Sequence, residues 1–96
     1  MKTYRLIEAS GEIRNHEVPT REDIFDALFG IDSDPVEIGR FYEKAEAMEE
    51  LSHRKCKVWK SGSVWRVSGF AVETFEADDD GEFMTGSDYD MAEISD

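Results

Sequence analysis

Hydrophobic and polar residues alternate along the beginning of the chain, and alternation with a period of two is typical of a half-buried strand. The segment Lys2–Ala9 is the first predicted strand. The Ser10-Gly11-Glu12 segment has turn-forming residues and is expected to end it. The pattern leaves open whether Ile13–Val18 forms a second, short strand.

A longer alternating stretch, Lys55–Ala77, contains a Ser61-Gly62 pair and is predicted to be a hairpin with its two-residue turn at that pair. This turn places Val58 opposite Trp65. The four side chains that we assign to the core face of the hairpin are Cys56, Val58, Trp65 and Val67. A short final strand around Phe83 is also left open, and the last residues are expected to form a frayed helix or an ordered tail.

Apolar residues recur at helical spacing in the segment Pro19–Gly30, which predicts a helix. Thr20 is a good N-cap residue, and Asp23 three residues later completes a pair that resembles a capping box. Gly30 is placed to end the helix. The apolar stripe consists of Ile24, Phe25, Leu28 and Phe29.

A second helix is predicted over Asp32–Arg54. Asp34 can cap it, Pro35 fits the first helical position, and Glu37 completes a D-x-x-E pair. The apolar side chains expected to face the core are Ile38, Phe41, Tyr42, Ala45, Met48 and Leu51.

These elements predict an α+β fold in which a small, mostly antiparallel sheet packs against two helices in two layers. The expected order is strand, helix, helix, strand, strand. The two strands that the sequence leaves undecided would follow the first strand and end the chain. Ninety-six residues fit a single domain, residues 1–96, with an acidic C-terminal segment over residues 73–96.

Net charge adds an asymmetry to this picture. The chain has 23 acidic and 11 basic residues, which give a net charge of −12. All of the lysines and arginines lie before residue 67, so every charged side chain in the last third of the chain is acidic. Such asymmetry indicates an interaction surface or an acidic tail. It argues against direct nucleic-acid binding and favours a basic protein partner.

The remaining composition indicates a soluble cytoplasmic protein. Cys56 is the single cysteine, which excludes an internal disulfide and fits a reducing compartment. No segment has the long apolar run of a signal peptide or a transmembrane helix, so no membrane association is expected.

The acidic segment Phe75–Phe83 partly matches a calcium-binding loop. With Gly81 at the invariant sixth position, Glu76, Asp78 and Asp80 occupy positions one, three and five. Position twelve, however, is Ser87, where that loop needs a bidentate glutamate. We therefore predict a tight turn at residues 78–81, and expect no metal or other cofactor; a weak calcium-binding module remains an alternative.

The acidic residues suggest two interpretations, a solvated face that maintains solubility or a surface that a partner recognises. Carboxylates three and four residues apart on a helix have Cβ atoms about 5–6 Å apart, which is near the spacing of phosphates along a strand. Phe83 and Tyr89 are candidate apolar anchors. The predicted acidic partner-binding residues are Glu43, Glu46, Glu49, Glu50, Glu73, Glu76, Asp78, Asp79, Asp80, Glu82, Asp88 and Asp90.

A basic cluster around the predicted hairpin suggests the opposite kind of partner. Its members are His53, Arg54, Lys55, Lys57, Lys60 and Arg66, interleaved with Trp59 and Trp65. Cations beside an aromatic side chain suit a single-stranded nucleic acid. The alternative is that these cations pair with nearby carboxylates, which the net charge favours.

Catalytic motifs are missing from the sequence, so we do not expect an enzyme. There is no glycine-rich phosphate loop, G-x-S-x-G elbow or H-E-x-x-H pattern. His53 and Cys56 have the spacing of two zinc ligands, but no second pair follows. Cys56 is expected to be a core side chain.

In size, charge and lack of catalytic motifs, the chain resembles the small acidic inhibitors with which phages and mobile elements block host defences, of the anti-CRISPR and anti-restriction type. The resemblance implies a non-catalytic, stoichiometric inhibitor, a DNA mimic that occupies a basic nucleic-acid-binding groove. The alternative is a small regulatory or accessory protein, monomeric or homodimeric, whose acidity serves only solubility.

Overall fold

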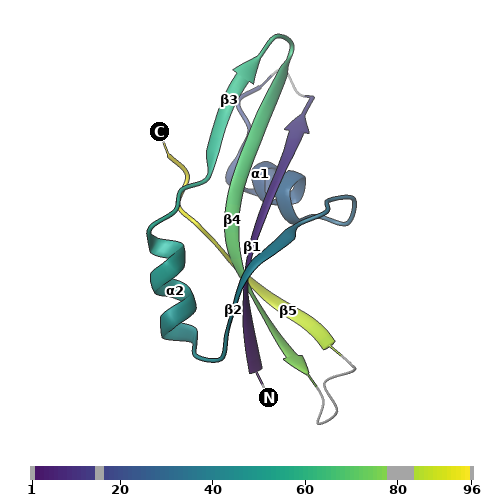
Figure 1. Cartoon of the computed structure of the whole chain (residues 1–96). Coiled ribbons are helices and arrows are strands. Elements are labelled where there is room, and N and C mark those ends of the chain that lie inside the picture. The colour runs from purple at the N-terminus through teal and green to yellow at the C-terminus, as the bar shows by residue number, and fades with distance from the viewer. Residues whose placement is uncertain (1, 15–16, 78–83, 96) are drawn as a thin grey trace.

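The computed structural model describes residues 2–14, 17–77 and 84–95 and shows an α+β fold with a five-stranded sheet and two helices (Figure 1). All pairs of neighbouring strands are antiparallel, which confirms the predicted fold class. The elements in chain order are β1 (Lys2–Ile13), α1 (Arg21–Phe29), β2 (Val36–Phe41), α2 (Lys44–Ser52), β3 (Lys57–Ser61), β4 (Val64–Ala77) and β5 (Met84–Met91).

The sheet is built around β1 and β4, which pair along the whole length of β1. The short β2 lies on the outer edge of β1. The opposite edge of β4 is shared, because β3 pairs with its first residues and β5 with its last. Figure 1 shows the resulting strong twist, with β3 at one end of the molecule and β5 at the other.

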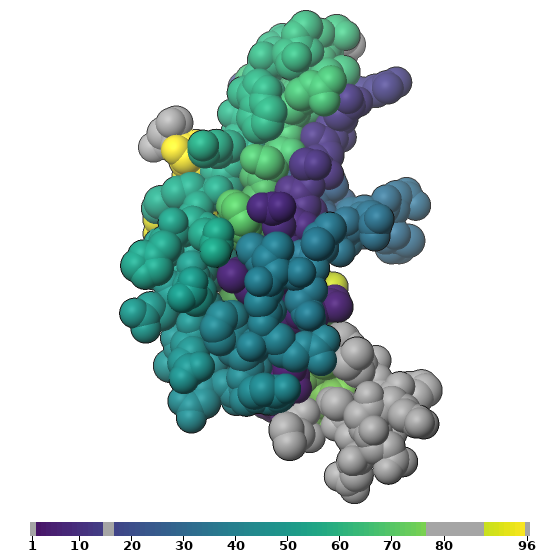
Figure 2. Space-filling model, viewed as in Figure 1, coloured from purple at the N-terminus to yellow at the C-terminus, as the bar shows by residue number. Residues whose placement is uncertain are grey.

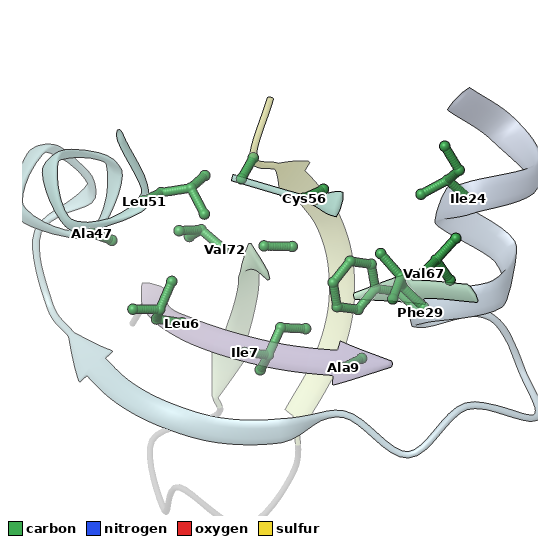
Figure 3. Close-up of a cluster of buried hydrophobic side chains, with 13 residues drawn as sticks. Leu6, Ile7, Ala9, Ile24, Phe29, Ala47, Leu51, Cys56, Val67 and Val72 are labelled. Atoms are coloured by element: carbon green, nitrogen blue, oxygen red, sulfur yellow. The ribbon is translucent and has the colours of Figure 1, made fainter. Parts of the chain in front are cut away.

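Both faces of the sheet are buried in its middle. Leu6 and Ile7 are 2% and 1% exposed, although neighbouring side chains of a strand point to opposite faces. On one face, Leu6 and Val72 lie beside α2; on the other, Ile7 and Ala9 lie on the side of α1 and Phe29 (Figure 3). The sheet therefore lies between the two helices, and the predicted two-layer packing is wrong. The sequence of β1 shows that both of its faces are apolar, but it does not show which helix covers each face.

The prediction of α1 is confirmed, including its boundaries. The Thr20 hydroxyl accepts a hydrogen bond from the Asp23 backbone N–H, and the Asp23 carboxylate accepts one from the Thr20 N–H. Ile24, Leu28 and Phe29 are buried against the sheet. The signals for this helix are local, so the sequence suffices to place it.

The predicted helix over Asp32–Arg54 is wrong in its first half, where β2 forms instead. Val36, Ile38 and Phe41 suit a strand as well as a helix, and pairing with β1 decides between the two. Only the second half is helical, and α2 starts after Glu43, whose side chain makes no capping hydrogen bond.

The break at β2 changes which side chains α2 buries. Ala47, which was not in the predicted stripe, is fully buried together with Leu51, and Met48 is half-buried. Tyr42 is 67% exposed, and Ala45 is exposed as well.

The β3–β4 hairpin is confirmed, but its turn consists of Gly62 and Ser63, and Gly62 has the positive φ of 64° that such a turn requires. Val58 therefore pairs with Val67, two residues from the predicted Trp65. A shift of two residues leaves each side chain on the same face of the strand, so the predicted core face is confirmed. Cys56 and Val67 are buried, and Val58 and Trp65 are half-buried.

The structure also corrects the predictions for the end of β1 and for the C-terminus. Ser10-Gly11-Glu12 is not a turn but part of β1, and no strand forms among the described residues of Ile13–Val18 beyond the end of β1. Gly11 serves close packing, because a Cβ there would lie 2.7 Å from the Ala27 carbonyl oxygen of α1. The final strand that the sequence left open exists as β5, which extends to Met91 into the segment predicted to be a frayed helix or an ordered tail.

Candidate protein-interaction surface

The outer face of α2 carries a row of carboxylates. Because Ala47 and Leu51 point into the core, Glu46, Glu49 and Glu50 remain exposed, as does Glu43 at the helix start. In the part of the chain that the structure describes, no ion pair involves any of these four glutamates. α2 and its N-cap therefore present four carboxylates to solvent beside one lysine, Lys44.

Further carboxylates lie on the sheet face that α2 covers. Val72 faces α2, and Glu76 lies on the same face because it is four residues along β4. Asp90 and Asp88 of β5 pair with Val72 and Thr74, so they share this face. Glu76 and Asp88 are exposed and Asp90 is half-buried, and none of the ion pairs recorded for the described residues includes them.

We call these seven residues the acidic surface; they are Glu43, Glu46, Glu49, Glu50, Glu76, Asp88 and Asp90. Five other predicted partner-binding residues, Asp78, Asp79, Asp80, Glu82 and Phe83, lie outside the described residues, and so does the predicted turn at residues 78–81. The strands on either side of that segment pair with each other, Ala77 with Met84.

Glu73 and Tyr89 lie on the opposite face of the sheet, in a polar cluster with Arg5. The Arg5 guanidinium donates a hydrogen bond to Glu73 Oε1, and the Tyr89 hydroxyl donates one of 2.6 Å to Oε2. Glu73 is only 8% exposed. Its carboxylate is thus already satisfied within the protein, and we leave it out of the acidic surface.

Tyr89 is integrated into the same cluster. Its ring contacts Phe25 edge-on and stacks on Phe29, with centroids 5.5 and 6.1 Å apart. The hydrogen bond to Glu73, with burial and the negative charge of that carboxylate, raises the pKa of Tyr89 to about 12. Tyr89 is nevertheless 38% exposed, so its ring both packs within the fold and reaches the surface.

Within the described ranges, five of the eleven lysines and arginines form ion pairs, all with acidic residues away from the acidic surface. Glu37 pairs with Arg5 at 3.8 Å and with Arg40 at 2.8 Å. Glu12 pairs with Arg66 at 3.3 Å and Arg14 at 3.8 Å. The Arg5–Glu37 and Arg66–Glu12 pairs connect different strands and the Arg40–Glu37 pair falls within the bulged β2, so sequence spacing did not indicate these three.

The basic cluster is largely engaged inside the molecule. Lys55 pairs with Glu93 at 2.6 Å, and the guanidinium of Arg54 lies over the Phe70 ring at 5.0 Å. Lys60 lies over Trp65 at 5.6 Å. These contacts agree with the interpretation that the cations are paired within the protein. Trp59 remains 45% exposed and pairs across the hairpin with Arg66.

Cys56, the single cysteine of the chain, is a core side chain. Cys56 is fully buried, its Sγ lies 3.8 Å from the Phe70 carbonyl oxygen, and burial raises the pKa of its thiol. A buried thiol with a raised pKa is a poor nucleophile. Among the described residues, no three His, Cys, Asp or Glu side chains are placed to hold a metal ion, and neither helix is long and apolar enough to cross a membrane.

Comparison of the chain with protein-family models, with curated protein sequences and with solved structures finds no match.

Proposed function

We propose that this protein is a non-catalytic binding protein whose acidic surface recognises a basic surface on another protein. The supporting observation is the distribution of unpaired charge. The described ion pairs involve Glu12, Glu37, Glu73 and Glu93 and no residue of the acidic surface. Exposed carboxylates outside these pairs also occur elsewhere, as at Glu8, Glu17 and Asp32, but the acidic surface has four of them between Glu43 and Glu50, along one helix and its N-cap.

The partner that we propose is a protein with a groove for nucleic acid. Glu49 and Glu50 lie three and four residues after Glu46, which corresponds to about 5–6 Å between the Cβ atom of Glu46 and those of the other two, near the spacing of backbone phosphates. A helix and a sheet hold these charges in place before binding, so little conformational entropy is lost on association. Binding would block the groove sterically, as in the anti-CRISPR and anti-restriction inhibitors that the chain resembles.

The test compares two variants with the same change in net charge. Glu43→Lys/Glu46→Lys/Glu50→Lys reverses charge on α2, and Glu8→Lys/Glu17→Lys/Asp32→Lys reverses three exposed carboxylates elsewhere. Wild-type protein is used to capture a partner from the native host, and the binding of each variant to the purified partner is measured against salt. The α2 variant loses two or more close charge pairs with the partner, so its dissociation constant for the partner is expected to rise at least about tenfold.

The control variant should bind within a few-fold of wild type. Equal weakening of both variants would mean that only total charge matters, and unchanged binding by the α2 variant would favour an accessory protein whose acidity serves solubility. A second readout is competition, because double-stranded DNA or RNA should displace the protein from its partner. An association rate that does not fall as salt rises would also contradict the proposal.

A further inference from the structure

The outer edge of β2 is open. Among the described residues, β2 pairs only with β1, and its exposed side chains include Val36 and Ile38, which are 60% and 42% exposed. Tyr42, directly after the strand, is 67% exposed. Figure 2 shows this segment, in blue, at the surface of the molecule. Soluble proteins protect such an edge with proline, charged side chains, especially lysine, or a bulge; β2 has no lysine or proline, but it has Glu37, Arg40 and a bulge at Ile38.

The sequence of β2 is complementary to itself. Its six residues are Val36, Glu37, Ile38, Gly39, Arg40 and Phe41. In an antiparallel pair of two copies centred between Ile38 and Gly39, Glu37 lies opposite the partner's Arg40. The two apolar ends meet in the same register, with Val36 opposite the partner's Phe41. Each copy contributes both halves of every pair, as a two-fold interface requires.

A bulge in β2 makes this charge pairing sterically consistent. Glu37 and Arg40 are three residues apart, so in a regular strand they would point to opposite faces. Ile38 is an extra residue without a partner on β1, because Gly39 pairs with Leu6 and Glu37 with Ile7. Glu37 and Arg40 therefore pair with Ile7 and Arg5, which share a face of β1. Their contact of 2.8 Å within one chain agrees with this placement.

We propose that two copies of this chain form a homodimer by antiparallel pairing of β2, centred between Ile38 and Gly39. The dimer joins the two sheets edge to edge and satisfies the open backbone groups of β2. Opposite residues have Cβ atoms about 4.5–5.5 Å apart, so the two Glu37–Arg40 pairs form directly across the two-fold axis. β2 itself has one negative and one positive side chain, so the contact is locally neutral in an otherwise acidic protein.

The test uses charge reversal and mixing. The mass of the wild-type protein in solution is measured by light scattering and sedimentation equilibrium from micromolar to millimolar concentration, and a dimer is expected. In Glu37→Arg, two arginines face the partner's two arginines, and in Arg40→Glu, two glutamates face two glutamates. Replacing both attractive pairs by repulsive ones should raise the dimer dissociation constant about tenfold or more for each variant alone.

An equimolar mixture of the two variants should restore dimers, because every arginine then faces a glutamate. The mixture also controls for folding, since misfolded chains would not regain a dimer together. Ile38→Lys should weaken the wild-type dimer, whereas Val18→Lys, at a site 71% exposed and outside the strands, should not. A wild-type protein that stays monomeric at millimolar concentration, variants that dimerise like wild type, or a mixture that stays monomeric would each overturn the proposal.

Discussion

Glu73 shows at the scale of one residue why an acidic side chain is not automatically part of an acidic surface. Its two oxygens accept hydrogen bonds from Arg5 and from Tyr89, and its side chain is 11% exposed. A buried carboxylate is stable only when it is paired and hydrogen-bonded. The cluster connects β1, β4 and β5, so it stabilises the sheet.

We predict that Glu73→Ala lowers the free energy of unfolding by about 2–3 kcal/mol, because it leaves Arg5 and the Tyr89 hydroxyl without their acceptor. The value is below that of a fully buried pair because Arg5 is 32% exposed. Urea unfolding followed by circular dichroism measures it. Glu76→Ala, at an exposed position of the same strand, is the control and should change stability by no more than about 0.5 kcal/mol. Equal effects of the two substitutions would contradict the role of the cluster.

The same cluster predicts a pH effect. The pKa of Tyr89 is raised from its ordinary value of 10.0 to about 12, so its contribution to stability is complete below pH 10 and is lost as the pH rises through 12. We expect one of the three tyrosines to ionise late in an ultraviolet titration, and Tyr89→Phe to remove that late step. In Glu73→Gln, the late step should move toward pH 10, because the negative acceptor is gone. A late step that persists in Tyr89→Phe would assign it to another tyrosine.

The two helices show at the scale of one element how far local sequence determines structure. α1 has a capping box, an apolar stripe and a terminal glycine between Thr20 and Gly30, and it forms as predicted. The stretch before α2 has equally good helical features at Asp34, Pro35 and Glu37, yet it becomes β2. Local preference is worth little per residue, and pairing with β1 outweighs it.

We predict that Thr20→Ala lowers the free energy of unfolding by about 1 kcal/mol, because it removes the hydroxyl that accepts the Asp23 N–H at 3.1 Å. Thr20→Ser keeps this acceptor and should retain most of the stability. Thermal and urea unfolding of the three proteins decide the question. If serine destabilises as much as alanine, the cap is not the cause.

At the scale of the whole molecule, the C-terminal residues connect its two ends by backbone hydrogen bonds. β3 and β5 share one edge of β4, and the chain after β5 crosses from one to the other. The Ala92 N–H donates to the Phe70 carbonyl oxygen at 2.9 Å. The Cys56 N–H donates to the Glu93 carbonyl and the Ser95 N–H to the Cys56 carbonyl, both at 2.8 Å. This crossing connects β3, β4 and β5.

We predict that a chain ending at Met91 loses about 3 kcal/mol of stability, because three backbone hydrogen bonds between distant segments are lost and the buried Ala92 is removed. Urea unfolding gives the difference, and amide hydrogen exchange at Cys56 should accelerate in the shortened chain. Ser95→Ala, which keeps the backbone, should be nearly neutral. A shortened chain with the wild-type unfolding midpoint would show that the crossing contributes nothing.

Sequence by itself determined the α+β class, α1, the β3–β4 hairpin with its core face, and the concentration of negative charge in the last third. These properties depend on local patterns and on composition. Only the tertiary structure decided that β2 is a strand, that the sheet lies between the helices, and which carboxylates are free. The reason is that sheet pairing joins distant residues. Arg5 satisfies Glu73 from 68 positions away, and no local pattern indicates such a partner.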